Sequence, residues 1–156
     1  MKKILIALDY DPTAQKVAEV GYLLAKSMGA EVVVLNVIDN PVFFYSKEYS
    51  PIMGFSGYLE AGRYQLETTE GIKEASQFFL DMSKRHLGDD TIQTLVKEGD
   101  IADTILKAAK KLKVDVIVLG SHSKKWLENI IMGSATEKVM RHTTSPLFIV
   151  PTKKPQ

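Results

Sequence analysis

Short runs of apolar residues alternate with stretches of helical periodicity along most of this 156-residue chain. The runs Ile4–Leu8, Glu31–Ile38 and Val114–Leu119 are mostly apolar, which is typical of strands that are buried on both faces. A helix is predicted between the first two runs, with Asp11-Pro12 at its start and Gly29 at its end. Because parallel strands need such crossover connections, the alternation predicts a parallel sheet covered by helices.

The remaining predicted elements continue this alternation to the end of the chain. They are a helix over about 61–86 that ends at Gly88, a strand over 91–97, a helix opened by Gly99-Asp100 with Asp103 in its first turn, a helix over 134–142 and a strand over 146–151. We therefore predict an α/β fold: one doubly wound, Rossmann-like domain over residues 1–151, with a five-stranded, mainly parallel sheet and helices on both faces. Residues 152–156 are predicted to be a flexible tail.

Composition excludes several classes of function. A formal net charge of +1 provides no electrostatic attraction for nucleic acid or for an acidic membrane surface. With no cysteine, the chain cannot use thiol catalysis, thiolate metal ligands or disulfides. No apolar stretch approaches the roughly 20 residues of a membrane span, and the N-terminal apolar run is too short for a signal peptide. We therefore expect a cytoplasmic protein.

The segment that follows the Val114–Leu119 run has features of an anion site. It opens on Gly120 and closes on Gly133-Ser134, and Glu137 stands three residues after Ser134, the pattern of a helix N-cap with a reciprocal capping box. A helix N-terminus presents unpaired N–H groups and a positive dipole end, and glycine allows a ligand to approach the backbone closely. This pattern predicts a cradle for a phosphate.

Gly-x-x-Ser-x9-Gly-Ser, beginning at Gly120, resembles the nucleotide-binding signature of the universal stress protein family, Gly-x-x-Gly-x9-Gly followed by Ser or Thr. Gly120, Gly133 and Ser134 match this signature, whereas Ser123 stands where the family's ATP binders carry their second glycine. Other blocks that resemble the family, in the same order, are residues 4–9, 34–39, 98–100 and 145–150.

The resemblance implies a site for ATP or AMP, with Mg²⁺ possible beside ATP, and a homodimer formed through the edge strand Leu147–Val150. Asp9 would approach the ribose and adenine, and Val37 would contact the adenine with its main chain and side chain. The residues that the resemblance assigns to the nucleotide are Ala7, Leu8, Asp9, Val37, Leu119, Gly120, Ser123, Gly133, Ser134, Ala135 and Thr136.

Structural roles are the alternative for several of these residues. Asp9 could instead cap the helix that begins near Pro12, and Ser134 with Glu137 is consistent with capping alone. His122 has no partner carboxylate or nucleophile that the sequence identifies, so solvent exposure or packing against a nucleotide is expected for it.

The chain lacks the Walker phosphate-binding run, the His-Glu-x-x-His motif and the Gly-x-Ser-x-Gly elbow. We therefore expect regulatory nucleotide binding in a stress response, with no catalytic residues and at most slow ATP hydrolysis. One alternative is a nucleotide-free dimeric scaffold whose aromatic segment 39–62 binds a protein partner. A weaker one is an enzyme acting on a nucleotide, with His122 or Asp9 as its acid–base group.

Overall fold

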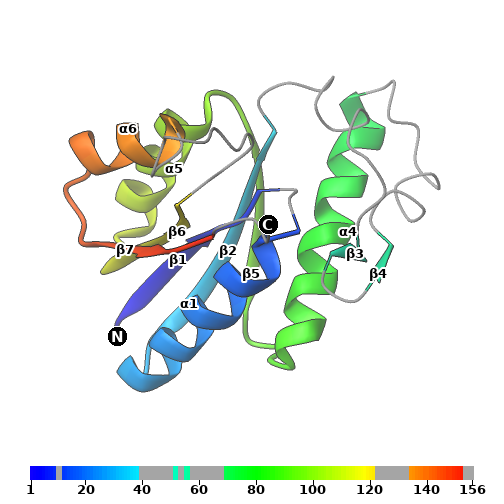
Figure 1. Ribbon diagram of the computed structural model, residues 1–156, viewed down its shortest axis with the longest axis horizontal. Coiled ribbons are helices and arrows are strands. Elements are labelled where there is room, and N and C mark those ends of the chain that lie inside the picture. The colour runs from blue at the N-terminus through cyan, green and yellow to red at the C-terminus, as the bar shows by residue number, and fades with distance from the viewer. Residues whose placement is uncertain (10–11, 39–50, 53–54, 57–68, 122–133, 153–156) are drawn as a thin grey trace.

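A sheet of five parallel strands forms the centre of the protein, with helices against both of its faces (Figure 1). The computed structural model describes residues 1–9, 12–38, 51–52, 55–56, 69–121 and 134–152. The strands of the sheet are β1 (Lys3–Ala7), β2 (Glu31–Ile38), β5 (Gln93–Glu98), β6 (Val116–Gly120) and β7 (Leu147–Val150). The helices are α1 (Ala14–Met28), α4 (Thr69–Leu87), α5 (Ile101–Leu112) and α6 (Ser134–His142), and β3 (Pro51–Ile52) pairs with β4 (Phe55–Ser56) in a separate antiparallel ladder.

The strand order is β5-β2-β1-β6-β7, so the predicted doubly wound topology is confirmed. The chain first winds outward from β1 through β2 to β5, and then crosses back to β6 and β7 on the other side of β1. The winding direction therefore reverses between β1 and β6. At such a reversal the connections that follow neighbouring strands leave toward opposite faces, and a crevice opens at the carboxyl ends of the strands.

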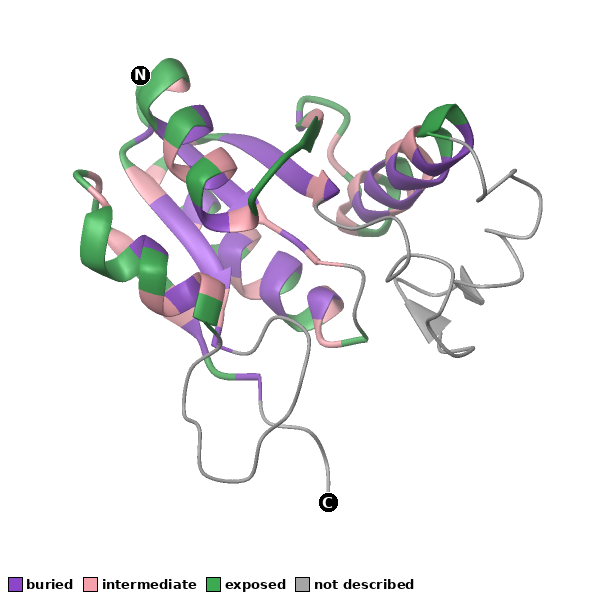
Figure 2. Ribbon diagram, turned by 90° about the horizontal axis from the view of Figure 1, so that it is seen from above, coloured by how far each residue is buried: buried purple, intermediate pink, exposed green. Residues whose placement is uncertain are grey.

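Alternate side chains of the central strands enter two separate cores. Ile4 and Ile6 of β1 pack with α1 and α4 on one face, whereas Leu5 packs with α5 and α6 on the other. The helix faces turned toward the sheet are buried, and the outward faces are largely exposed (Figure 2). Two-sided burial therefore explains why the central strands are continuous apolar runs rather than alternating ones.

Helix ends follow the predicted signals with some shifts. Gly88, at φ +70°, ends α4, and its N–H donates to the carbonyls of Lys84 and Arg85 at 3.1 Å. The start of α1 was predicted at Asp11-Pro12, but the helix begins at Ala14 with Thr13 in the N-cap position, so Asp9 does not occupy that position. Asp11 and the first part of the predicted 61–86 helix lie outside the described residues.

The prediction for residues 114–119 placed the start of a strand too early. Val114 instead follows the C-cap of α5: Lys113 adopts a left-handed conformation, and the Val114 N–H donates to the carbonyl of Ala109 at 3.1 Å. β6 consequently begins at Val116 and extends to Gly120. None of the helices in the described ranges combines the length and apolar character that a membrane crossing needs.

Gly21 gives a test of the packing of α1 on β1. A Cβ at this position would lie 2.8 Å from Cδ1 of Ile6. Gly21→Ala gains about 1 kcal/mol of helix propensity but overpacks the core by about 1–3 kcal/mol. We expect a net loss of about 1 kcal/mol in the free energy of unfolding, measured by urea denaturation.

Ile6→Val supplies the control because it removes the clashing Cδ1 atom. Alone it should cost about 0.5–1.5 kcal/mol, and combined with Gly21→Ala it should cost clearly less than the sum of the two. Strict additivity would show that Ile6 is not what excludes a side chain at position 21.

Candidate functional site

The carboxyl ends of β1, β2 and β6 bring most of the described candidate residues to one rim of the sheet. Leu8 and Asp9 follow β1, Val37 lies near the end of β2, and Gly120 ends β6. Ile6 is paired with Val118 in the ladder between β1 and β6, so the ends of these two strands are adjacent. The rim lies at the reversal of winding, where doubly wound folds bind their ligands.

At the end of β1, both backbone polar groups of Leu8 are fixed by β2. The Leu8 N–H donates to the carbonyl of Leu35 at 2.8 Å, and the Leu8 carbonyl accepts a hydrogen bond from Nδ2 of Asn36 at 2.7 Å. Asp9, the next residue, is partly exposed, with its Oδ2 atom buried. Asp9 is therefore carried by a firmly held stretch of backbone at the rim.

Gly120 is closely packed at the end of β6. A Cβ there would lie 3.0 Å from Cγ2 of Val17 and 3.2 Å from Cγ2 of Thr152, closer than most real Cβ contacts. The sequence interpretation attributed this glycine to close approach of a phosphate to the backbone. This close packing is an alternative reason for glycine at position 120.

The hydroxyl of Thr136 joins the first turn of α6 to the end of β6. It donates to the carbonyl of Gly120 at 2.9 Å, and Thr136 is buried. This hydroxyl is therefore committed within the protein, which limits what Thr136 can offer a phosphate to its backbone N–H. Of its neighbours in that turn, Ser134 is exposed and Ala135 is partly buried.

The predicted capping box at the start of α6 is not formed. Glu137 was expected to reach back to the backbone of Ser134. Its carboxylate instead pairs with the guanidinium of Arg141, one turn further along the helix, at 2.8 Å. The i, i+4 spacing of these two charges favours this local pair.

The chain after β7 returns to the rim, contrary to the prediction of a free tail from residue 152. Thr152 is buried, and its N–H donates to Oγ of Ser121 at 2.9 Å. The N–H of Ser121 in turn donates to the carbonyl of Val150 at 2.9 Å. Ordered structure thus extends through Thr152, and residues 153–156 lie outside the described part of the chain.

Several predicted residues also lie outside the described part. These are Ser123 and Gly133 of the signature, together with His122. Within the ranges that the structure describes, no group of three or more His, Asp or Glu side chains could hold a metal ion.

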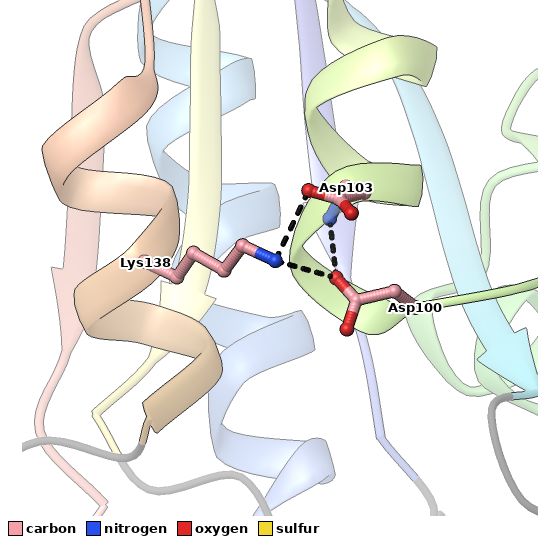
Figure 3. A network of polar contacts seen from close by, with 3 residues as sticks. All are labelled: Asp100, Asp103 and Lys138. Atoms are coloured by element: carbon pink, nitrogen blue, oxygen red, sulfur yellow. Dashed lines mark hydrogen bonds and ion pairs between the residues drawn. The ribbon is translucent and has the colours of Figure 1, made fainter.

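A charged cluster that the sequence interpretation did not single out connects the N-terminus of α5 to α6 (Figure 3). Nζ of Lys138 lies 3.2 Å from Oδ2 of Asp100 and 3.2 Å from Oδ1 of Asp103. Asp100 is also the N-cap of α5, because its Oδ2 accepts the backbone N–H of Asp103 at 2.9 Å. The sequence indicated only part of this cluster. Asp100 was predicted to open the helix, but nothing in the sequence pairs Lys138 with it.

These contacts shift the protonation of both partners. The backbone N–H of Asp103, and then the ammonium of Lys138, lower the pKa of Asp100 below its ordinary value of 3.8. Hydrogen bonds to Asp103 and Asp100 raise the pKa of Lys138. Because the side chains are about half exposed, we expect the cluster to add little to the stability of the fold.

The titration of Asp100 tests this cluster. Since its folded pKa is lowered, its stabilising contribution is fully present above the unfolded value of 3.8 and is lost as the pH falls through the folded value. Lys138→Met should raise the pKa of Asp100 toward 3.8 without reaching it, because the Asp103 N–H bond persists. NMR titration of the Asp100 carboxyl carbon measures this shift.

Lys16→Met, which removes an exposed lysine of α1, is the matched control for the loss of one charge. It should leave the Asp100 pKa unchanged. An Asp100 pKa that is equal in wild type and Lys138→Met would contradict the contact.

Comparison with known proteins identifies relatives over nearly the whole chain. The chain is 27% identical over 155 residues to universal stress protein MJ0577 of Methanocaldococcus jannaschii, covering 97% of this chain and 96% of that protein. It is 32% identical over 157 residues to universal stress protein MJ0531 of the same organism, covering 99% of this chain and 84% of that protein.

Solved structures show the same fold. The structure of MJ0577 superimposes with a TM-score of 0.74 at 25% identity, covering 99% of this chain and 98% of that one. A universal stress protein solved in complex with cAMP has a TM-score of 0.63 at 15% identity, covering 97% and 98% of the two chains. The universal stress protein family model matches residues 1–151, and the chain belongs to that family.

Proposed function

We propose that this protein binds an adenine nucleotide, ATP or AMP, at the carboxyl rim of the sheet and acts as a regulatory protein in a stress response. The observation that carries the proposal is the convergence of Asp9, Val37 and Gly120 at the reversal of winding, with the first turn of α6 bonded to the same strand end. Family membership and the cAMP complex of one relative of this fold support an adenine nucleotide as the ligand.

In this proposal each part of the nucleotide meets a different part of the rim. The Asp9 carboxylate, supported by the backbone of Ala7 and Leu8, accepts hydrogen bonds from ribose hydroxyls, and Val37 contacts the adenine. Phosphates lie against the backbone N–H groups at the N-terminus of α6, where the helix dipole favours negative charge. The residues assigned to the ribose and phosphates are Leu119, Gly120, Ser123, Gly133, Ser134, Ala135 and Thr136.

The proposal assigns no catalytic residue. Main-chain donors bind a phosphate without activating a nucleophile, and an NTPase needs a positioned water and charge stabilisation at the γ-phosphate. Slow hydrolysis is the most that we assign, with Mg²⁺ entering together with ATP. A signal requires the bound nucleotide to favour one of two conformations, so its affinities for the two must differ.

Nucleotide binding can be tested on the purified protein and on a variant of Asp9. Purified protein, denatured and analysed by chromatography, should release an adenine nucleotide, and ATP at about 100 times its dissociation constant should stabilise the fold by about 2.7 kcal/mol. Asp9→Asn should weaken ATP binding about tenfold, which corresponds to about 1.4 kcal/mol, because it removes a charged acceptor.

Asp90→Asn is the matched control, since Asp90 is an exposed carboxylate far along the chain from the rim residues. Ser123→Gly restores the family's signature; if the family's glycine has a positive φ there, a serine costs on the order of 1–2 kcal/mol, and the change should tighten binding. No released nucleotide and no thermal shift at millimolar ATP would favour the nucleotide-free scaffold; its suggested partner segment, 39–62, falls mostly outside the described residues.

We also propose a homodimer through β7. This strand forms one edge of the sheet, and Phe148 on it is 38% exposed. A sheet edge is a surface that proteins tend to protect, and pairing with a second edge is one way to do so. The proposal therefore joins two copies edge to edge through Leu147–Val150.

Phe148→Glu should convert this dimer into a monomer, because it places a charge in the centre of the paired edges. Sedimentation velocity measures the change in mass. Gln93→Glu, on the opposite edge strand β5, adds the same charge and should leave the dimer intact. A wild-type protein that sediments as a monomer at micromolar concentration would refute the dimer.

A further inference from the structure

A buried polar network crosses the apolar core directly beneath the rim. Asn36, in the middle of the apolar β2 run, is 3% exposed, and Ser76 of α4 is 0% exposed. Nδ2 of Asn36 donates to the Leu8 carbonyl at 2.7 Å, and Oδ1 of Asn36 accepts the Ser76 hydroxyl at 2.5 Å. Since buried polar groups are costly without partners, these contacts form a satisfied chain that joins β1, β2 and α4.

The Leu8 carbonyl, which can only accept, determines which way the Asn36 amide faces, and the Ser76 hydroxyl satisfies the other end of that amide. An amide has one donating and one accepting end, and a hydroxyl that donates to Oδ1 leaves Nδ2 for the Leu8 carbonyl. The reverse orientation would place Oδ1 against that carbonyl, two acceptors with no proton between them. Ser76 therefore supports, from α4, the orientation that the Leu8 carbonyl requires of Asn36.

The Asn36 amide replaces a backbone contact that the ladder would otherwise make. Leu8 donates its N–H to the Leu35 carbonyl, so Leu35 and Val37 direct their backbone groups toward β1, and Ile38 directs its carbonyl to Gly99 on the β5 side. A continued parallel ladder would pair the Val37 N–H with the Leu8 carbonyl. In the described part of the chain, the Val37 N–H donates to no backbone carbonyl.

We propose that Asn36, held in place by Ser76, is a positioning residue that keeps the Val37 N–H available to the base of a bound adenine nucleotide. By occupying the Leu8 carbonyl, Asn36 stops the β1–β2 ladder from closing one step further and fixes the backbone that carries Asp9. This inference rests on the proposed nucleotide function and adds to it two residues that do not touch the ligand.

Asn36→Leu tests the role with a side chain of similar size that can neither donate nor accept. Without the amide, the Val37 N–H is expected to pair with the Leu8 carbonyl, and ATP binding measured by calorimetry should weaken at least tenfold. In the nucleotide-free protein, amide hydrogen exchange at Val37 should slow toward that of Leu35, which lies inside the ladder. A purely structural role for Asn36 would speed exchange there, not slow it.

Ser76→Ala and Ser83→Ala form a matched pair on one helix. Both serines lie on α4 and are 0% exposed, but the Ser83 hydroxyl donates to the Phe79 carbonyl of its own helix at 2.8 Å. Each variant loses one buried hydroxyl, and only Ser76→Ala releases Asn36. We expect several-fold weaker ATP binding for Ser76→Ala and less than a twofold change for Ser83→Ala, at a temperature where circular dichroism shows all variants folded.

The possible outcomes separate this inference from the proposed function. If the wild type binds neither ATP nor AMP, the proposed function fails and the positioning role fails with it. If the wild type binds ATP and both Asn36→Leu and Ser76→Ala bind it equally well, only the positioning role is overturned. If Asn36→Leu does not fold, the Ser76→Ala and Ser83→Ala comparison decides: equal affinities overturn the role, and a selective loss in Ser76→Ala supports it.

Discussion

Burial of β1 on both faces is the constraint on which the rest of the structure depends. β1 lies between β2 and β6, and Ile4, Leu5 and Ile6 are completely inaccessible to solvent. Burying each such side chain contributes about 1.5–3 kcal/mol, so both faces must be covered, one by α1 and α4 and the other by α5 and α6. With the faces covered, a ligand can reach the backbone of the inner strands only where they end.

In the described part of the rim, side-chain donors form hydrogen bonds to backbone carbonyls at the strand ends. The Asn36 amide occupies the carbonyl of Leu8, and the Thr136 hydroxyl occupies that of Gly120. Gly120 itself fits closely between Val17 and Thr152. A rim fixed in this way loses little further freedom when a ligand binds, which favours affinity for a given set of contacts.

Particular residues show how far prediction from the sequence extends. Gly88 and Asp100 were identified correctly as a helix end and a helix start, because their signals are local: a residue that tolerates a positive φ, and a carboxylate before a first turn. Thr152 was assigned to the tail. The Ser121 hydroxyl that accepts its N–H lies 31 residues earlier in the chain, so no local pattern indicated this contact. Glu137 was expected in a capping box but pairs with Arg141, another local partner that competes for the same carboxylate.

The order of strands and helices, the two-sided burial of the central strands and the family were determined by the sequence alone, because apolar periodicity and short motifs act over a few neighbouring residues. The polar contacts between those elements at the rim were decided only by the tertiary structure. Asn36 meets Leu8 across 28 residues, Ser76 meets Asn36 across 40, and Lys138 meets Asp100 across 38. No local pattern encodes such pairs, because each exists only after packing of the sheet and helices has brought distant polar groups together and made their burial without partners costly.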